Sequence, residues 1–556
     1  MNIRFLGAVE GVTGSCHLIE FRDKLIMLDC GMYQGKDKDF NYKGHEVSPE
    51  NIDYLLLSHS HIDHSGRIPL LVKNGFKGTI YCSKPTYDLC EIMLLDSAHI
   101  QEAEAEWRNR KARRSGKPTV PPLYTQTNVY DSFKYFKPVL YEQIVKIDEF
   151  LTVRFNDAGH VLGSSIIEMW FEEDDGITKV VYSGDLGMRD KPLLKDPVII
   201  GSADYVILES TYGNRIHANT EQPEEQLLNI ILKTVRRGGT VIIPSFAVGR
   251  TQEIIYHLNK YYDNSLGSAS DKINELKRIP VYIDSPLAKK ATEVFWRNAH
   301  AFDKEARNYL MMGDNPLQFE NLHFTENVEE SKMLNHSDEP KIIISSSGMC
   351  DAGRIKHHLK HNLWKKECSV VFVGYQAEGT LGRRILDGAK DVKIFGEEIH
   401  VNAEIHNVEG FSAHADRNGL INWLKGFKEK PRKIFLVHGE AQSKAEFANE
   451  IKNILDIDCV IPAYNVIYKV KKRAEVVELS LKHRTWEEWA AVEENALMEE
   501  LKNKLRNLKR VSETAFNLTE EWLREDDFNL DRYNRINNEL AEIESRIMNL
   551  ALLSGE

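Results

Sequence analysis

Short apolar runs recur through the first 210 residues at the spacing of β-strands. They are rich in Val, Ile, Leu and Tyr, which is typical of buried strands, and they cover residues 3–6, 25–29, 54–58, 153–155, 179–183 and 205–209. Several of these runs end on a polar residue that begins a loop. Because active residues in layered α/β proteins usually lie at strand ends, these loops are the first places to look for chemistry.

The middle of the chain has a different pattern. A helical stretch near 221–235 is followed by continuous apolar runs at 240–244, 280–284, 341–345 and 369–374. Buried strands that alternate with helices predict a mostly parallel sheet between residues 211 and 390. Short strands return over 391–475, including 433–438.

The last segment, 476–556, nearly lacks Gly and Pro and predicts two or more helices, packed as a hairpin. Its apolar positions step by three and four in the manner of a heptad: Leu497, Leu501, Leu505 and Leu508, then Tyr533, Ile536, Leu540, Ile543, Ile547 and Leu550. Such a seam favours intramolecular packing or a homodimer. Residues 481–556 hold 11 Lys/Arg against 17 Asp/Glu, half of the chain's net charge of −12.

Composition limits the class of protein. With 42% hydrophobic residues over 556 positions, the chain can bury large cores, and global disorder is excluded. No apolar run reaches the ~18 residues of a membrane span, and the start lacks a signal-peptide pattern, so we expect a cytoplasmic protein without a membrane partner. Seven cysteines without a CxxC pair argue against disulfides and thiolate zinc sites.

The strongest chemical signal follows the apolar run at 54–57. His59, His61, Asp63 and His64 stand within six residues, which is hard to explain by packing because each buried polar atom would need a partner. On a loop that leaves a strand, these side chains can converge on metal ions. Imidazole nitrogen and carboxylate oxygen suit zinc, with manganese or iron as alternatives.

Further candidate ligands stand at other strand ends. His160, Asp185 and His438 each lie beside a glycine, which permits a close approach of backbone to a metal. Together with the first cluster, and with Asp29 at the end of the run 25–29, their order resembles the metallo-β-lactamase fold. The resemblance implies that His59, His61 and His160 hold one metal, that Asp63, His64 and His438 hold the other, and that Asp185 bridges the two. Asp29 would support the cluster from outside.

The long gap between Asp185 and His438 holds two further motifs, Glu209 in Leu-Glu-Ser-Thr-Tyr-Gly and His414 in Phe-Ser-Ala-His-Ala-Asp. These resemble the diagnostic residues of the β-CASP nucleases, and a histidine at 438 resembles their RNA-directed members. The resemblance covers about 1–475. It implies an α/β protein, an αββα metallo-β-lactamase sandwich (1–210 and 391–475) interrupted by a β-CASP insert (211–390), with a C-terminal helical extension (476–556).

The implied reaction is hydrolysis of RNA to 3′-hydroxyl and 5′-phosphate ends with two divalent metals. Asp185 would bridge the metals and Asp63 would orient the attacking water. We expect His414 to act as general acid, with Glu209 fixing its tautomer. A structural role for His414, as a histidine at a helix start, stays open.

Several loops after the predicted strands offer groups that could bind phosphate. The candidates for substrate binding are Arg250, Ser345, Ser346, Ser347, Gly348 and Arg383. A separate basic segment, from Arg108 to Lys117, is either a solvated helix face or a wall of an RNA channel. We expect single-stranded RNA as the partner. The alternatives are a DNA-processing nuclease and a small-ester or thioester hydrolase on the same fold.

Overall fold

The protein is described here from a computed structural model that covers residues 1–174, 176–217, 223–262 and 271–470. The predicted helices of 476–556 lie outside the described residues. Within these ranges no helix is long and apolar enough to cross a membrane.

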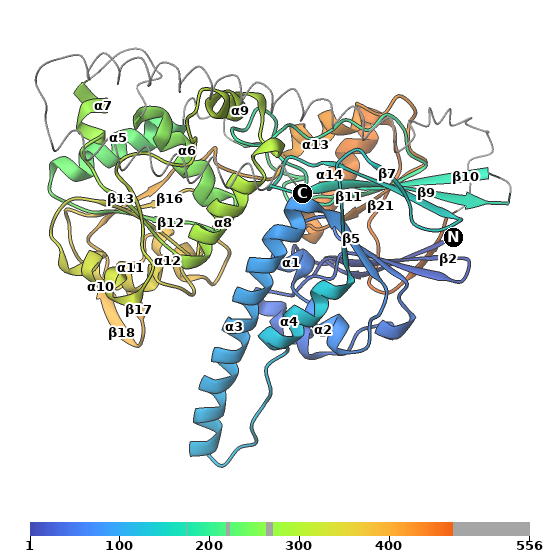
Figure 1. Cartoon of the computed structure of the whole chain (residues 1–556), viewed down its shortest axis with the longest axis horizontal. Helices are drawn as coiled ribbons and strands as arrows, with labels where there is room; N and C mark the ends of the chain where they lie inside the picture. Colours follow the sequence, from blue (N-terminus) through green and yellow to red (C-terminus); the bar gives the residue numbers. More distant parts are fainter. Residues whose placement is uncertain (175, 218–222, 263–270, 471–556) are drawn as a thin grey trace, which may run out of the picture. The chain divides into compact units, whose positions relative to one another are not determined.

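Two seven-stranded sheets form a sandwich (Figure 1). The first sheet runs, in spatial order, through β22 (Ile467–Lys469), β1 (Asn2–Gly7), β2 (Cys16–Phe21), β3 (Lys24–Leu28), β4 (Tyr54–Leu56), β5 (Thr79–Ser83) and β6 (Phe136–Val139). The second runs through β21 (Cys459–Val460), β20 (Lys433–Val437), β11 (Tyr205–Glu209), β10 (Gly176–Tyr182), β9 (Ser165–Glu173), β8 (Leu151–Asp157) and β7 (Ile144–Lys146).

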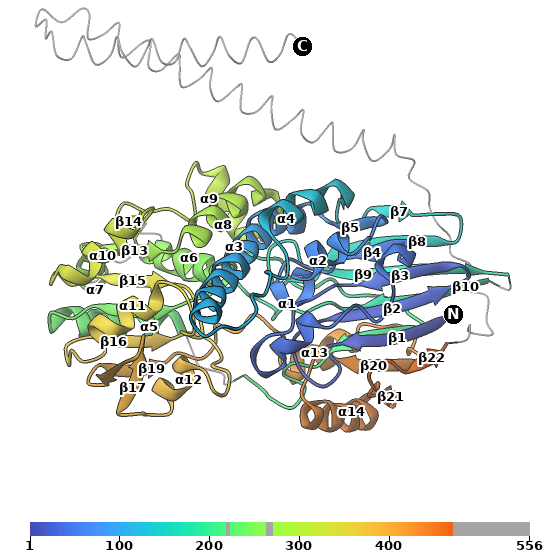
Figure 2. The same ribbon diagram turned by 90° about the horizontal axis from the view of Figure 1, so that it is seen from below.

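The inner faces of these two sheets share one buried core, to which Phe5 contributes from β1, and Phe155 and Phe171 from β8 and β9. Helices cover the outer faces (Figure 2). On the first sheet these are α1 (Ile62–Ser65), α2 (Ile68–Lys73), α3 (Lys84–Arg114) and α4 (Gln126–Ser132), and on the second they are α13 (Arg417–Leu424) and α14 (Ala441–Leu455). This arrangement confirms the predicted αββα sandwich.

The third sheet has six strands, all parallel, as the sequence predicts for this region. Its order is β14 (Leu322–Phe324), β13 (Val281–Asp284), β15 (Ile342–Ser345), β12 (Val241–Pro244), β16 (Ser369–Phe372) and β19 (Glu404–Asn407). Because β19 lies beyond residue 390, this sheet extends past the predicted end of the insert. A separate hairpin joins β17 (Asp391–Ile394) to β18 (Glu397–His400).

Helices cover both faces of the third sheet, which explains its continuous apolar strands. They are α5 (Pro223–Arg236), α6 (Arg250–Tyr262), α7 (Asp271–Leu276), α8 (Pro286–Arg297), α9 (Lys304–Met311), α10 (Val328–His336), α11 (Ile355–Asn362) and α12 (Leu381–Leu386). The predicted helix near 221–235 corresponds to α5.

Candidate metal centre

The histidine-rich loop begins directly after β4 and ends in the short helix α1. Its backbone is held by the loop that follows β3, since the Cys30 N–H donates to the His64 carbonyl at 2.8 Å and Met32 does the same to Ile62 at 2.8 Å. Gly31 makes this close approach feasible, because a Cβ there would lie 1.6 Å from the Asp63 carbonyl oxygen. These backbone contacts therefore fix the conformation of the histidine-rich loop without any bound metal.

The other candidate ligands come from the ends of strands in the second sheet. His160 follows β8, Asp185 follows β10, and His438 follows β20. All three are buried. The C-terminal ends of these strands lie at the same edge of the sandwich as the loop after β4. Residues from distant parts of the chain therefore meet at this edge.

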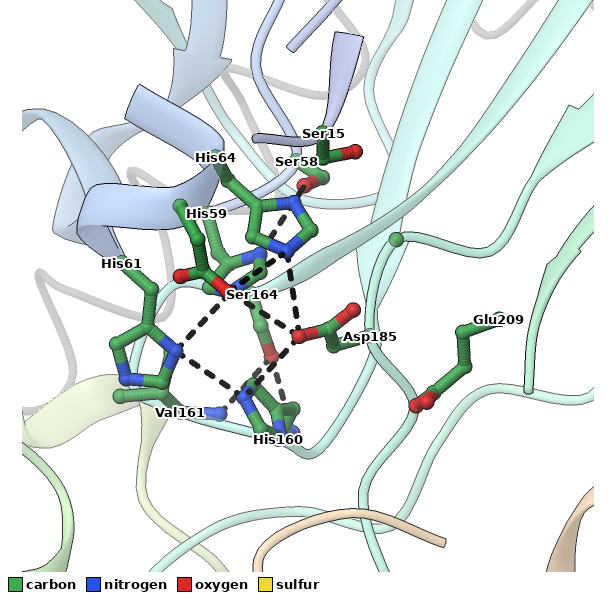
Figure 3. A network of polar contacts seen from close by, with 12 residues as sticks. Ser15, Ser58, His59, His61, His64, His160, Val161, Ser164, Asp185 and Glu209 are labelled. Carbon is green, nitrogen blue, oxygen red and sulfur yellow. Dashed lines mark hydrogen bonds and ion pairs between the residues drawn. The ribbon is translucent and has the colours of Figure 1, made fainter. Parts of the chain in front are cut away.

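One group of donor atoms comprises His59, His61, His160 and Asp185 (Figure 3). The distances are 3.1 Å between His59 Nε2 and His61 Nδ1, and 3.2 Å between His160 Nε2 and His61 Nδ1. Asp185 Oδ2 lies 3.6 Å from His59 Nε2 and 3.7 Å from His160 Nε2. These atoms all lie within 4.8 Å of one another, close enough to surround one cation.

The second group comprises Asp63, His64 and His438. His64 Nε2 and His438 Nε2 are 3.2 Å apart, and Asp63 Oδ2 lies 3.6 Å from His438 Nε2. Asp185 Oδ2 is also 3.3 Å from His64 Nε2. Asp185 is therefore adjacent to both groups, in the position of a shared ligand.

The electrostatics of these residues fit divalent cations. Burial lowers the pKa of His59, His61 and His160, and the positive charge of neighbouring histidines adds to this effect for His59. Neutral imidazoles at these distances direct lone pairs toward a common point, which is the form that binds metals. Asp185 Oδ1 is buried without a hydrogen-bond partner among the described residues. A cation would satisfy both features.

The pKa values of His64 and Asp63 also indicate a site that favours positive charge. Burial opposes protonation of His64, but Asp185 and Asp29 outweigh it and raise its pKa well above the ordinary value. Burial likewise opposes ionisation of Asp63, yet contact with His438 and His64 lowers its pKa to about 2. Buried carboxylates that draw charge from histidines are suited to a site that holds metal ions.

Asp29 lies behind the candidate metal ligands and is fully buried. Its Oδ2 accepts from Ser58 Oγ and Tyr182 OH at 2.7 Å each and lies 2.7 Å from His64 Nδ1, while Oδ1 accepts from the Ser58 N–H at 2.7 Å. A proton on His64 Nδ1 leaves Nε2 free as a metal donor. The sequence points to Asp29 but not to Tyr182, which is brought in by the second sheet.

Thr211 is a second supporting residue that the sequence analysis did not identify. Its Oγ1 donates to the His438 carbonyl at 3.2 Å and lies 3.0 Å from His438 Nδ1, so the hydroxyl oxygen accepts a hydrogen bond from Nδ1–H and leaves Nε2 to face Asp63. Thr211 stands two positions after Glu209, at the end of β11. That proximity to a recognised motif is the only sequence signal that could have indicated it.

Glu209 and His414 form a pair beside the candidate metal ligands. His414 Nδ1 lies 3.3 Å from both Glu209 carboxylate oxygens and 4.0 Å from Asp185 Oδ2. Burial would lower the pKa of His414, but Glu209 and Asp185 raise it to about 9. Glu209 is itself held by the Leu186 N–H, which donates to Oε1 at 2.6 Å.

A cavity of about 370 Å³ opens over this centre, a size typical of ligand-binding sites. The sandwich contributes His61, His160, His414 and His438 to its lining, and the loops of the third sheet contribute Phe246, Arg250, Gly348 and Tyr375. A substrate in this cavity would contact both parts of the fold.

The six predicted substrate-binding residues are distributed unevenly. Arg250 and Gly348 line the cavity. The three serine hydroxyls donate within the protein, Ser345 to the Asp284 carbonyl at 2.8 Å, Ser346 to Ser285 Oγ at 2.9 Å and Ser347 to the Ala352 carbonyl at 3.2 Å. Arg383 pairs with Asp387 at 2.9 Å and does not line the cavity.

Comparison with known protein families gives three matches along the chain. Residues 9–226 match the metallo-beta-lactamase superfamily, residues 251–385 match the Beta-Casp domain, and residues 398–462 match the Zn-dependent metallo-hydrolase RNA specificity domain. Together these matches cover most of the described chain.

Individual relatives are similar over nearly the same region. Ribonuclease TTHA0252 of Thermus thermophilus is 36% identical over 80% of this chain and 94% of its own length. In Methanocaldococcus jannaschii, the transcription termination factor FttA is 32% identical over 83% of this chain and 70% of its own length, and an RNase J-like protein is 31% identical over 84% and 99%. The chain belongs to the β-CASP ribonuclease family of the metallo-β-lactamase fold.

Proposed function

We propose that this protein hydrolyses phosphodiester bonds of single-stranded RNA with two bound metal ions, leaving 3′-hydroxyl and 5′-phosphate ends. The observation that carries the proposal is the pair of adjacent ligand groups around Asp185, with the Glu209–His414 pair beside them at the floor of one cavity. The choice of RNA is supported by the RNA specificity match and by the relatives named as ribonucleases.

We propose zinc as the native metal, since five imidazoles and two carboxylates make up the donor set. Manganese and iron accept the same ligands and are the alternatives. When bound, two such ions supply a water that ionises near neutral pH and positive charge for the phosphate oxygens. Asp185 would be their common ligand.

The protein's own residues orient the reactants and move the proton. Asp63, at the edge of the second ligand group, accepts a hydrogen bond from the attacking water and aims it at phosphorus. The water loses one proton to solvent as it ionises, and the new bond then forms between its oxygen and phosphorus while the bond to the 3′ oxygen breaks. His414 lines the cavity and Glu209 holds its Nδ1, so His414 would donate its Nε2 proton to that leaving oxygen.

Arg250 is our candidate for a contact to a substrate phosphate. It lines the cavity, and its Nε is buried without a hydrogen-bond partner among the described residues. Its Nη1 donates to Glu253 at 2.7 Å, which fixes the guanidinium in place. A guanidinium that is fixed beside a cavity suits a phosphate oxygen, because its planar set of N–H donors matches phosphate geometry.

The test is to incubate purified protein with labelled single-stranded RNA and DNA of one sequence, with and without a chelator, and with zinc, manganese or iron restored afterwards. We expect chelator-sensitive cleavage of RNA, with products that carry 5′-phosphates. Asp185→Ala should abolish cleavage and reduce bound metal, whereas Asp338→Ala, at an exposed carboxylate, should change neither.

Three outcomes would replace the proposal. Preferential cleavage of DNA would make the protein a DNA-processing nuclease. Turnover of a small ester or thioester without cleavage of RNA would make it a small-molecule hydrolase on this fold. Wild-type turnover by Asp185→Ala would refute the two-metal mechanism.

A further inference from the structure

Three loops of the third sheet approach the cavity side by side. They follow β12, β15 and β16, which are adjacent and parallel, so the loops leave from the same edge of the sheet. Their cavity-lining residues include Phe246, Gly348 and Tyr375. Two of these three are aromatic, in a cavity whose opposite side carries the metal ligands.

Both aromatic rings are exposed where neighbouring apolar residues are not. Phe246 is 45% exposed and Tyr375 is 43% exposed, whereas Ala247 and Val248, next along the chain, are buried in the core of the third sheet. Burial of an aromatic side chain stabilises a fold by roughly 1.5–3 kcal/mol. The fold does not gain this stabilisation in full at Phe246 and Tyr375, because both rings remain partly exposed beside the cavity. Packing therefore does not account for their positions.

Close packing and hydrogen bonds connect the loops that carry the two rings. Phe246 lies against Gly348, where an added Cβ would be 3.0 Å from ring atoms Cδ2 and Cε2, so a larger residue would displace the ring. The Phe246 carbonyl accepts from Thr251 Oγ1 at 2.7 Å. Buried Gln376 donates to the Gly348 carbonyl at 3.0 Å and thereby links the Gly348 loop to Tyr375.

Positive charge accompanies the aromatic faces. Arg250 lines the same cavity, and the Arg215 guanidinium lies 5.8 Å from the centre of the Tyr375 ring. A ligand that has flat apolar faces and attached negative charge would match this combination. Nucleotides have both features, and single-stranded nucleic acids commonly bind by stacking on aromatic side chains beside basic groups.

We propose that Phe246 and Tyr375 form a nucleobase-binding subsite, in which the base of a nucleotide next to the scissile phosphate stacks on these rings. The proposal rests on the proposed ribonuclease function and specifies how the strand is held. Because every base has a flat π-face, stacking of this kind confers little sequence preference. Positioning of the adjacent phosphate over the metal centre would then not depend on base identity.

The test measures stacking and catalysis separately. An oligoribonucleotide that contains 2-aminopurine and slowly cleaved phosphorothioate linkages is titrated with metal-loaded protein, since 2-aminopurine fluorescence is quenched when the base stacks. Phe246→Leu and Tyr375→Leu should reduce quenching and weaken binding by about 5-fold to 150-fold each. Phe246→Tyr and Tyr375→Phe should retain both the quenching and the binding affinity of the wild type, because each keeps an aromatic ring.

The matched control is Phe395→Leu, since Phe395 is 55% exposed on the β17–β18 turn and does not line the cavity. It should leave quenching and KM for natural RNA at wild-type levels, while the two subsite variants raise KM more than they lower kcat. Unchanged quenching and KM in both Leu variants would overturn the subsite. If the wild type stacks 2-aminopurine but does not cleave RNA, the ribonuclease function fails and the subsite stands.

Discussion

Four of the five imidazoles in the two ligand groups, all except His61, are oriented by a contact to Nδ1, the ring nitrogen that faces away from the site. His59 Nδ1 lies 3.0 Å from Ser58 Oγ, and His160 Nδ1 lies 3.4 Å from the Ala413 carbonyl. Asp29 and Thr211 do the same for His64 and His438. The contacts direct Nε2 of all four rings inward, so the geometry of the site is set by residues that would not touch the metal.

We predict that Tyr182→Phe weakens metal binding without unfolding the protein. The variant removes one 2.7 Å hydrogen bond to Asp29, which loosens the orientation of His64. Loss of such a supporting contact typically costs about 10-fold to 100-fold in metal affinity. Competition with a chromophoric chelator measures this, and the control is Tyr468→Phe, at a tyrosine whose hydroxyl accepts from the Ala463 N–H at 2.9 Å. Equal affinity in both variants would contradict the role of Tyr182.

We predict that His414→Ala retains its metal and loses most of its rate, by about 10²-fold to 10⁴-fold, because the leaving oxygen lacks a proton donor. Metal analysis and single-turnover cleavage of RNA separate the two effects. His336→Ala, at an exposed histidine on α10, should have no effect on rate. An unchanged rate in His414→Ala would leave His414 with a structural role at its helix start.

At the level of whole elements, the sequence predicted strands and their loops better than the direction of side chains within a loop. The apolar runs identified β12, β13, β15 and β16 because strands buried on both faces require them. The serines after β15 were predicted to meet phosphate, yet their hydroxyls bond inside the protein. The residues opposite them are Asp284, the last residue of β13, and Ser285 directly after it, which stand 61 positions earlier, and no local pattern reveals such a pairing.

Asp284 holds this corner of the third sheet together. It is fully buried and accepts from His358 and Ser331 at 2.6 Å each, and from Arg354 at 2.6 Å. Burial alone would raise its pKa, but these partners lower it well below the ordinary value. The folded state therefore favours the ionised form.

We predict that Asp284→Asn lowers the free energy of unfolding at pH 7 by about 1.5–3 kcal/mol, the range for hydrogen bonds to a charged group. Since the pKa of Asp284 is lower in the folded state, its contribution is complete above roughly pH 4 and decreases as the pH falls below that value. Urea unfolding of both proteins at pH 7 and at pH 3 measures the difference. A difference that grows at low pH would contradict this account.

The basic segment lies on the last turns of α3, a helix of 31 residues. Lys111 packs 3.6 Å from the centre of the Trp107 ring, and Arg108 bonds Glu104 and Tyr42. None of its charges lines the cavity, and basic groups at a helix C-terminus are favoured by the helix dipole. The structure supports the simpler of the two interpretations, a solvated helix face.

We therefore predict that replacing Arg110, Arg113 and Arg114 by alanine leaves the salt dependence of RNA binding unchanged. Binding to a single-stranded RNA is measured by anisotropy from low to moderate salt. If the three side chains contacted phosphates, the slope of log K against log salt would fall by about 0.7 for each. Such a fall would place the segment in the RNA path.

Over the whole molecule, charge is divided between parts with different predicted roles. Half of the net −12 belongs to residues 481–556. Buried carboxylates at the metal centre account for part of the remainder, so the formal charge overstates the repulsion that an RNA phosphate would meet.

We predict that the full chain is a homodimer and that a chain ending at residue 476 is a monomer, on the hypothesis that the heptad seam predicted from the sequence forms the subunit contact. Size-exclusion chromatography with light scattering gives the mass of each. An unchanged number of subunits after truncation would remove the 476–556 segment from the assembly. The truncated protein should keep its metal, since every proposed ligand precedes residue 439.

The proposed ligands His64 and His438, whose Nε2 atoms are 3.2 Å apart, stand 374 positions from each other along the chain. During translation, the ribosome therefore releases the first histidines long before the last one exists. Strand β1 likewise cannot pair with β22 until late in synthesis, because Asn2 pairs with Lys469. The proposed two-metal centre therefore cannot be complete on a nascent chain that still lacks residue 438, so it can form only after nearly the entire sandwich has been synthesised.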